Sequence, residues 1–297
     1  MPARSPAYSL RRLFFAFSAL IICAYVISLF QNWHSALKDT QNSLTHINSA
    51  QVQGVYATLK SYELVLASLG GELFSIGALS HPENGRELIE RMKSIAPDMV
   101  GFGLARPDGQ LVLVSGIKGN TPLPNLLSMP ESHDSFMHTI TTGHIQMGRP
   151  YFMKPLGQWA IPIRTPIYSK TGELVAVMTA GYSISASSTG WSNIEFPQHV
   201  VSALLRDDGY LQFIYPEIKL TRQEIYGQPV ASQTISQAAA LPATKGFTSM
   251  YFPRLNTHAY LAYQRLDEYS LLSGSFIPRV YVVGLWLEKM IAPSVLL

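Results

Sequence analysis

Two arginines and four aromatic side chains between residues 149 and 182 have the clearest potential for ligand chemistry. Arginine holds a carboxylate through two parallel hydrogen bonds, and tyrosine and tryptophan add apolar area with a polar edge. Because residues 179–183 carry no carboxylate, the two arginines favour an anionic ligand over an amine. Alternate strand residues point to opposite faces, so the pattern leaves open which of the six line a pocket. The candidate ligand-binding residues are Arg149, Tyr151, Trp159, Arg164, Tyr168 and Tyr182, with Arg149 and Trp159 as first choices.

Other groups of reactive residues lack the spacing that catalysis or metal binding requires. His133, His138 and His144 lie five and six residues apart, whereas two metal-binding histidines on one helix face are four apart. The single cysteine, Cys23, excludes a CxxC metal or redox site. The stretch Gly-Tyr-Ser-Ile-Ser at 181–185 lacks the final glycine of a serine-nucleophile turn. We therefore predict no enzymatic activity, no metal site and no cofactor.

The composition is that of a globular chain with a substantial core. Hydrophobic residues make up 47% of the 297 residues and charged residues 14%, against a typical soluble value of about 25%. The formal net charge is +3, from 22 Lys and Arg against 19 Asp and Glu, without the clustered basic residues of a nucleic-acid surface. A chain of this length accommodates about two domains. Composition thus excludes global disorder and nucleic-acid binding.

An uncharged apolar segment near the N-terminus predicts a transmembrane helix at residues 13–30. A helix of this length spans about 27 Å, close to the roughly 30 Å hydrocarbon core of a membrane. Three arginines precede the segment and the next lysine or arginine is Lys38, which predicts a cytoplasmic segment 1–12 and an extracytoplasmic body. A cleaved signal peptide is the alternative, but its apolar part is usually only about 7–15 residues long. We therefore expect an uncleaved anchor in the inner membrane and a periplasmic body.

The segment after the anchor predicts one long stalk helix, residues 31–81. Apolar residues recur about every 3.5 positions, and the residue before Pro82 is pushed out of the helical region. A bend is expected at Gly70-Gly71. The apolar stripe of this helix can form a dimer face or pack against the chain's own domains, and both interpretations stay open. Its members are Leu37, Leu44, Ile47, Val52, Val55 and Leu59.

The C-terminal segment, residues 279–297, also admits two interpretations. The eight residues after Lys289 are uncharged, but Glu288 and Lys289 interrupt the apolar run, which is too short to span a membrane. The segment is either a terminal core helix or the first turns of a second membrane helix, and the second interpretation implies a truncated receptor.

The residues between these helical segments predict short strands and turns in two similar units, residues 82–190 and 191–278. The turns Arg106-Pro-Asp-Gly and Arg206-Asp-Asp-Gly occupy equivalent strand–turn–strand positions, 100 residues apart. This recurrence predicts a duplicated α/β unit. Strands are expected over 99–105, 111–115, 159–168, 174–184, 200–206, 211–215, 247–252, 258–265 and 271–276, and short helices over 85–95, 132–142, 221–226 and 232–241.

The order of these elements resembles the double Cache family, the tandem PAS-like extracytoplasmic sensor domains of bacterial receptors. The resemblance is carried by Gly148-Arg-Pro-Tyr-Phe152, by residues 157–167 and 172–178, and by Ser273-Gly-Ser-Phe-Ile-Pro278 followed by Trp286. It covers about residues 10–297. It implies an α+β fold in which a transmembrane helix continues into a long stalk helix, followed by two PAS-like antiparallel-sheet units. It also implies a homodimer placed upstream of a diguanylate cyclase, a histidine kinase or a chemoreceptor signalling domain.

One departure from the family pattern bears on the ligand. Amino-acid-binding members of the family share an Arg-x-Trp-Tyr run on the distal helix and an aspartate on the last distal strand. The corresponding stretches here, Asp134-Ser-Phe-Met-His138 and residues 179–183, contain neither feature. The resemblance therefore argues against an α-amino acid held in that manner.

The leading hypothesis is a membrane-anchored sensor that binds a small anionic ligand in its distal unit and transmits a conformational signal across the membrane. Its expected partners are that ligand, the membrane with one or two spans, and a second copy of the chain, but no nucleic acid. Two alternatives stay open. One is a truncated diguanylate cyclase or other receptor enzyme that lacks its output domain. The other is an anchored envelope protein with a structural or partner-binding role.

Overall fold

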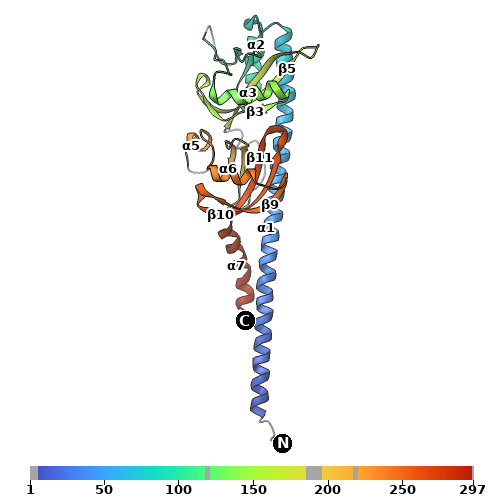
Figure 1. Cartoon of the computed structure of the whole chain (residues 1–297), viewed down its shortest axis with the longest axis vertical. Coiled ribbons are helices and arrows are strands. Elements are labelled where there is room, and N and C mark those ends of the chain that lie inside the picture. Colours follow the sequence, from blue (N-terminus) through green and yellow to red (C-terminus); the bar gives the residue numbers. More distant parts are fainter. Residues whose placement is uncertain (1–5, 118–120, 185–195, 217–219, 296–297) are drawn as a thin grey trace.

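One helix, α1 (Pro6–Ser75), runs along the whole molecule in the computed structural model (Figure 1). Its 70 residues correspond to about 105 Å at 1.5 Å per residue. Two sheet units are stacked beside one half of α1, and the N-terminal half extends away from them (Figure 1). The structure describes residues 6–117, 121–184, 196–216 and 220–295. The predicted unit boundary at 190–191 and residues 1–5 of the predicted cytoplasmic segment lie outside these residues.

The two halves of α1 differ in what surrounds them. Residues 11–35 contain no buried side chain, and large apolar side chains such as Leu13 and Phe17 are more than half exposed. Within the described part of the chain, this is the one helical segment long and apolar enough to cross a membrane. Every described side chain that is buried lies at Ala36 or beyond. Residues 31–297, called the body below, therefore contain the complete described core.

The apolar stripe on the body's part of α1 packs against the chain's own sheets. Leu44, Val55 and Leu59 are at most 1% exposed, and α1 contacts strands of both units. Five of the six predicted stripe residues are therefore core side chains, as the second interpretation expects, whereas Leu37 is only half-buried. The helix is unbroken at Gly70-Gly71, where a bend was expected. A Cβ at Gly70 would lie 2.4 Å from Cδ1 of Ile167, so the glycine lets α1 approach the distal sheet closely.

The stalk helix ends earlier than predicted, at Ser75 instead of His81. Gly77 adopts φ +74°, a left-handed conformation that closes a helix and that glycine adopts without strain. The N–H of Ala78 donates to the carbonyl of Leu73 at 3.0 Å. The short 3₁₀-helix η1 (Pro82–Gly85) then leads into α2 (Arg86–Ile95).

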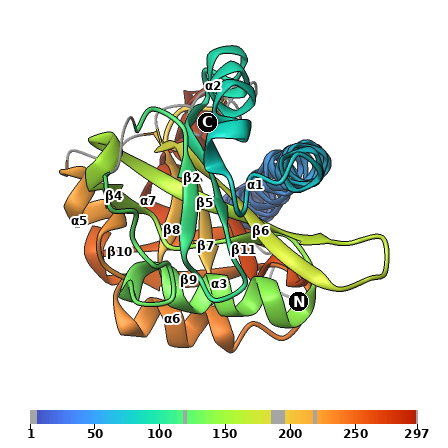
Figure 2. The same cartoon turned by 90° about the horizontal axis from the view of Figure 1, so that it is seen from above.

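The distal unit is a mixed-length antiparallel sheet with strand order β2-β1-β6-β5-β3, and β4 pairs with β5 beside β3. Its strands are β1 (Met99–Ala105), β2 (Leu111–Val114), β3 (Gln146–Met147), β4 (Tyr151–Met153), β5 (Gln158–Tyr168) and β6 (Leu174–Ser183). Helix α3 (Pro130–Thr142) and the turn η2 (Lys154–Leu156) complete it. Helix α1 lies on one face of the sheet and α3 on the other (Figure 2).

The proximal unit repeats this arrangement with strand order β8-β7-β11-β10-β9. Its strands are β7 (Val201–Arg206), β8 (Leu211–Tyr215), β9 (Lys245–Phe252), β10 (Thr257–Leu266) and β11 (Leu271–Pro278). Helices α5 (Arg222–Tyr226) and α6 (Ser232–Ala239) and the turns η3 (Pro253–Leu255) and η4 (Asp267–Tyr269) connect them. In both units the third strand of the order, β6 or β11, is the last along the chain.

The two turns that suggested a repeat have the same geometry. Gly109 and Gly209 adopt φ +85° and +87° and donate to the carbonyls of Arg106 and Arg206 at 3.0 and 2.9 Å. Both turns connect the first two strands of their units. The predicted α+β fold with two antiparallel-sheet units is therefore confirmed.

The C-terminal helix α7 (Arg279–Val295) continues from β11 and returns beside α1 (Figure 1). The rings of Trp33 and Trp286 meet edge to face at 5.8 Å, and Lys289 Nζ lies 3.2 Å from an Asp39 carboxylate oxygen. The helix buries Val282 but leaves Leu285 and Leu287 about half exposed. The start and the end of the body are thus joined as a helix pair.

Candidate ligand-binding site

A cavity of about 610 Å³ lies on the face of the distal sheet that points away from α1. Its walls are mostly apolar side chains of β1, β2, β4 and β6 and of the segment that leads into α3. A cavity of this size is typical of small-molecule sites, which lie in the range of about 300–1,000 Å³. The apolar wall includes Leu111, Val114, Leu123, Met129, Met153 and Leu156.

Glycines on the strands keep this cavity open. A Cβ at Gly101 would lie 3.0 Å from Cδ1 of Leu156, and a Cβ at Gly181 would lie 3.0 Å from Sδ of Met153. Both neighbours are wall residues, so side chains at these glycines would fill space that a ligand can use. The sequence motif Gly101-Phe-Gly103 therefore shapes a pocket wall within a strand.

Four polar side chains reach the cavity wall: Glu131, Tyr151, Lys154 and Thr179. Burial, the largest influence, raises the pKa of the Tyr151 hydroxyl; the Arg164 charge opposes this shift and that of Glu131 adds to it. Tyr151 is therefore a neutral hydrogen-bonding group at physiological pH. Glu131 and Lys154 are exposed, so both charges stand at the rim.

Arg164 lies beneath this wall, opposite Thr179 on the neighbouring strand, and is fully buried. Its Nη1 donates to Ser135 Oγ at 2.5 Å and its Nη2 donates to Ser132 Oγ at 2.6 Å. Its Nε has no hydrogen-bond partner, and no carboxylate among the described residues forms an ion pair with it. Burial lowers the pKa of Arg164 to about 10, which still leaves the guanidinium charged at neutral pH. The sheet therefore holds an uncompensated positive charge next to Tyr151.

Trp159 and Tyr182 point to the opposite face of the sheet, toward α1. Tyr182 is 2% exposed, and its ring centroid lies 5.6 Å from that of Tyr62 on α1. Trp159 packs at the edge of the same core, with its ring 6.3 Å from Phe152. Neither residue belongs to the cavity wall. Strand alternation separates them from Tyr151 and Arg164, and the sequence did not indicate which of the two faces holds the cavity.

Tyr168 stands at the far end of β5 and is 46% exposed. It is remote from the cavity wall, which includes no residue of β5. Of the six residues predicted from sequence, Tyr151 lines the cavity, Arg164 lies behind it, and the other four point elsewhere.

Arg149 connects the two units instead of lining the cavity. Its Nε lies 2.9 Å from Asp208 Oδ2 of the proximal turn, and its Nη2 lies 3.0 Å from Asp134 Oδ2 of α3. Its guanidinium carbon sits 4.8 Å from the centroid of the Tyr210 ring. Arg206 completes the cluster with a 3.1 Å contact to Asp208 and a hydrogen bond to the Met147 carbonyl. Arg149, which the sequence analysis placed among the first choices for ligand binding, is thus an ion-pair bridge between the two units.

Sequence reasoning missed Glu131, Lys154 and Thr179 as wall residues. Thr179 could have been found, because it lies two residues before Gly181 on the same strand face. Glu131 lies in the first turn of α3 and Lys154 begins η2, and where these elements sit depends on how they pack on the sheet, so no local pattern marks the two residues.

Comparison with known proteins gives similarity in fold but not in sequence. No protein-family model matches the chain, and no curated protein matches it in sequence. The extracellular domain assigned to the histidine kinase rpHK1S-Z16 is similar with TM-score 0.65 and 18% identity, and the match covers 83% of this chain and 98% of that domain.

Chemoreceptor domains are similar to a comparable extent. The ligand-binding domain of the Pseudomonas aeruginosa PAO1 amino acid chemoreceptor PctB, in complex with L-Gln, has TM-score 0.57 and 15% identity, covering 84% of this chain and 97% of that one. The ligand-binding domain of the Pseudomonas fluorescens chemoreceptor CtaA, in complex with L-isoleucine, has TM-score 0.57 and 14% identity, covering 85% and 98%. The chain therefore has the Cache-type fold of the extracytoplasmic sensor domains of histidine kinases and chemoreceptors, with two stacked sheet units.

Proposed function

We propose that this chain is the sensing module of a transmembrane receptor, that it binds a small organic carboxylate in the distal cavity, and that it signals through α1 and α7. The observation that carries the proposal is the open distal cavity with a buried, uncompensated guanidinium, Arg164, behind its polar edge. A ligand carboxylate near Tyr151 would offset that charge at close range in a poorly solvated site.

The charges at the rim refine the ligand class. Lys154 and Arg164 contribute two positive charges and Glu131 one negative charge, so the site as a whole favours an anion. The solved chemoreceptor domains with this fold include complexes with L-Gln and L-isoleucine. An α-amino acid is the second candidate, because Glu131 could hold its ammonium group while Lys154 holds its carboxylate.

Strand β6 provides a physical route from the cavity to the membrane. Thr179 and Gly181 line the cavity from one face of this strand, and Tyr182 contacts Tyr62 of α1 from the other. A ligand that binds two positions of β6 with different affinity shifts the equilibrium between them, and α1 moves with the strand. We place the exposed apolar end of α1 in the inner membrane, the body in the periplasm, and a second copy of the chain beside the first.

Calorimetric titration of the body with acetate, lactate, pyruvate, succinate, L-Gln and L-isoleucine tests this function. We expect at least one carboxylate to bind, and Lys154→Gln to weaken that binding about tenfold because a charge-assisted contact is lost. Lys170→Gln changes an exposed lysine in the β5–β6 turn and should leave the affinity within about twofold.

The proposal fails if none of the six compounds binds, or if Lys154→Gln and Lys170→Gln bind equally well. Preferential binding of L-Gln or L-isoleucine over the simple carboxylates would instead support the amino-acid alternative. Tyr151→Phe provides a second measure, because it removes only the hydroxyl of a residue that lines the cavity, and it should also weaken carboxylate binding.

A further inference from the structure

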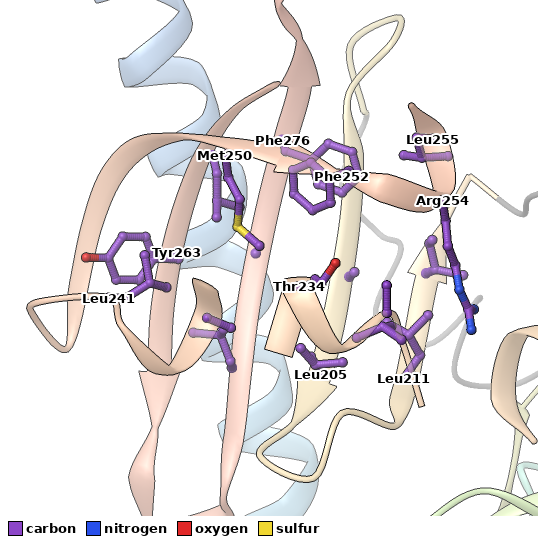
Figure 3. Close-up of a pocket in the computed structure, with 18 residues that line it drawn as sticks. Leu205, Leu211, Thr234, Leu241, Met250, Phe252, Arg254, Leu255, Tyr263 and Phe276 are labelled. Carbon is purple, nitrogen blue, oxygen red and sulfur yellow. The ribbon is translucent and has the colours of Figure 1, made fainter. Parts of the chain in front are cut away.

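A second pocket lies in the proximal unit, between the sheet and helix α6 (Figure 3). Its volume is about 120 Å³, and it occupies the sheet face away from α1, as the distal cavity does in its own unit. The wall is almost entirely apolar, with Leu205 and Leu211 at one side and Met250, Phe252 and Phe276 at the other. The polar side chains on it are Thr234, Tyr263 and Arg254.

Alternation along the strands separates this pocket from the closed core. On β11, Leu272 and Phe276 face the pocket and keep 8% and 4% exposure, whereas Leu271, Ser273 and Ser275, on the face toward α1, are at most 1% exposed. The residue between the two pocket-facing side chains is Gly274, which leaves the centre of the wall without a side chain. Helix α6 therefore covers this outer face of the sheet, but side chains do not fill the space between them.

Arg254 supplies a positive charge at the wall of this apolar pocket. Its Nη2 donates to the Pro229 carbonyl at 2.9 Å and its Nη1 to the Glu224 carbonyl at 3.4 Å, which orients the guanidinium across the connection between α5 and α6. Both contacts that orient the guanidinium are to backbone oxygens, and among the described residues no carboxylate forms an ion pair with it. The guanidinium can therefore accept an anionic group from outside the chain.

We propose that the proximal unit binds a short aliphatic carboxylate, with the alkyl chain in the apolar pocket and the carboxylate at Arg254. An apolar cavity of about 150 Å³ stays dry and takes up a molecule the size of benzene, so the smaller volume here has room for an alkyl chain of about four carbons. In a six-carbon acid, the methylene next to the carboxylate then lies at the mouth, beside Arg254. The site is separate from the distal cavity and binds mainly through its apolar wall. The site also contacts β11, the strand that continues into α7, so a bound ligand can shift the position of α7 at the membrane end of the body.

The test uses hexanoate, hexan-1-ol and acetate as probes, in calorimetric titrations of the body, which contains the whole described core. Hexanoate should bind, and hexan-1-ol should bind about tenfold more weakly than hexanoate because it lacks the charge. Acetate has no chain for this pocket, so it should leave hydrogen exchange at residues 232–239 unchanged, whether or not it binds in the distal cavity. When hexanoate is bound, amide hydrogen exchange should slow at residues 232–239 of α6, which cover the pocket, and at residues 245–252 of β9, which form one wall.

A pair of adjacent substitutions on α6 locates the site. Ala238 lines the pocket and Ala239 is exposed, so Ala238→Leu fills the pocket while Ala239→Leu adds the same side chain to the surface. Ala238→Leu should weaken hexanoate binding at least about tenfold and Ala239→Leu should leave it within about twofold. Arg254→Gln should weaken hexanoate binding about tenfold and leave hexan-1-ol unchanged.

Three results would overturn the proposal. They are the absence of hexanoate binding at millimolar concentration, equal affinity in the two alanine variants, and exchange protection at residues 99–105 and 174–183 of the distal sheet instead of the proximal peptides. Should Ala238→Leu fail to fold, the exchange measurement on the wild-type body decides by itself. Lys154→Gln should not alter hexanoate affinity, which separates this site from the distal one.

Discussion

The bridge between the two units makes a quantitative prediction about Arg149. Replacement of Arg149 by alanine removes its contacts to Asp208 and Asp134 and its position over the Tyr210 ring. The Asp208 side chain is 25% exposed and the Asp134 side chain 61%. A hydrogen bond to a partly buried charged group contributes about 1.5–3 kcal/mol, whereas an exposed ion pair contributes about 0–1 kcal/mol.

The expected loss is therefore about 2 kcal/mol of unfolding free energy, most of it from Asp208. In a protein of this size, 1 kcal/mol corresponds to about 2–4 °C in Tm, so Arg149→Ala should lower Tm by about 4–8 °C. Thermal unfolding of the body, followed by tryptophan fluorescence, measures this shift. The double variant with Asp208→Asn should lose about 1 kcal/mol less than the sum of the single variants, because both remove the same contact.

The matched control is Arg91→Ala, which breaks the ion pair with Glu87 on α2. The two side chains are 65% and 88% exposed, so this loss should stay below about 0.5 kcal/mol. If Arg149→Ala destabilises the body no more than Arg91→Ala, or if its effect adds fully to that of Asp208→Asn, the assignment of Arg149 as an interdomain bridge is wrong.

Three further predictions concern single residues. Burial raises the pKa of Asp208, but the hydrogen bonds and charges of its two arginine partners outweigh burial and hold the pKa below the ordinary 3.8. The resulting stability is present above that unfolded-state value and is lost as pH falls through the folded-state pKa, so the Tm advantage of wild type over Asp208→Asn should shrink between about pH 5 and pH 2.5. Gly70→Ala should destabilise the body by about 1–3 kcal/mol, because the added Cβ would lie 2.4 Å from an isoleucine carbon. Gly71→Ala, which has open space around it, should stabilise the body by up to about 1 kcal/mol. Urea unfolding compares the two variants, and equal effects would contradict the close approach of α1 to the distal sheet. Arg164→Met should change the unfolding free energy by less than about 1 kcal/mol, because a buried charge without a counter-charge adds little stability. The same variant should weaken carboxylate binding about tenfold in calorimetry. A loss of several kcal/mol of unfolding free energy would show instead that Arg164 is structural.

Local patterns in the amino-acid sequence were sufficient to predict most of the elements and their order. The apolar run at 13–30, the periodicity of the stalk and the two Asp-Gly turns each depend on neighbours within a few residues. These patterns predicted the strands of both sheets, apart from the short β3 and β4, to within two residues of the observed ends. The end of α1 was misplaced, because a left-handed glycine at 77 closes the helix before the proline does.

Tertiary structure alone decided which side chains share a site. Alternation shows that Tyr151 and Tyr182 belong to opposite sheet faces only once the pairing of their strands is known, and which face receives α1 is a property of packing. Packing likewise turned the stalk stripe into core and brought Arg149 to an aspartate 59 residues away, out of reach of the cavity. A strand's own residues specify its period, but the identity of what covers each face comes from segments distant in the chain.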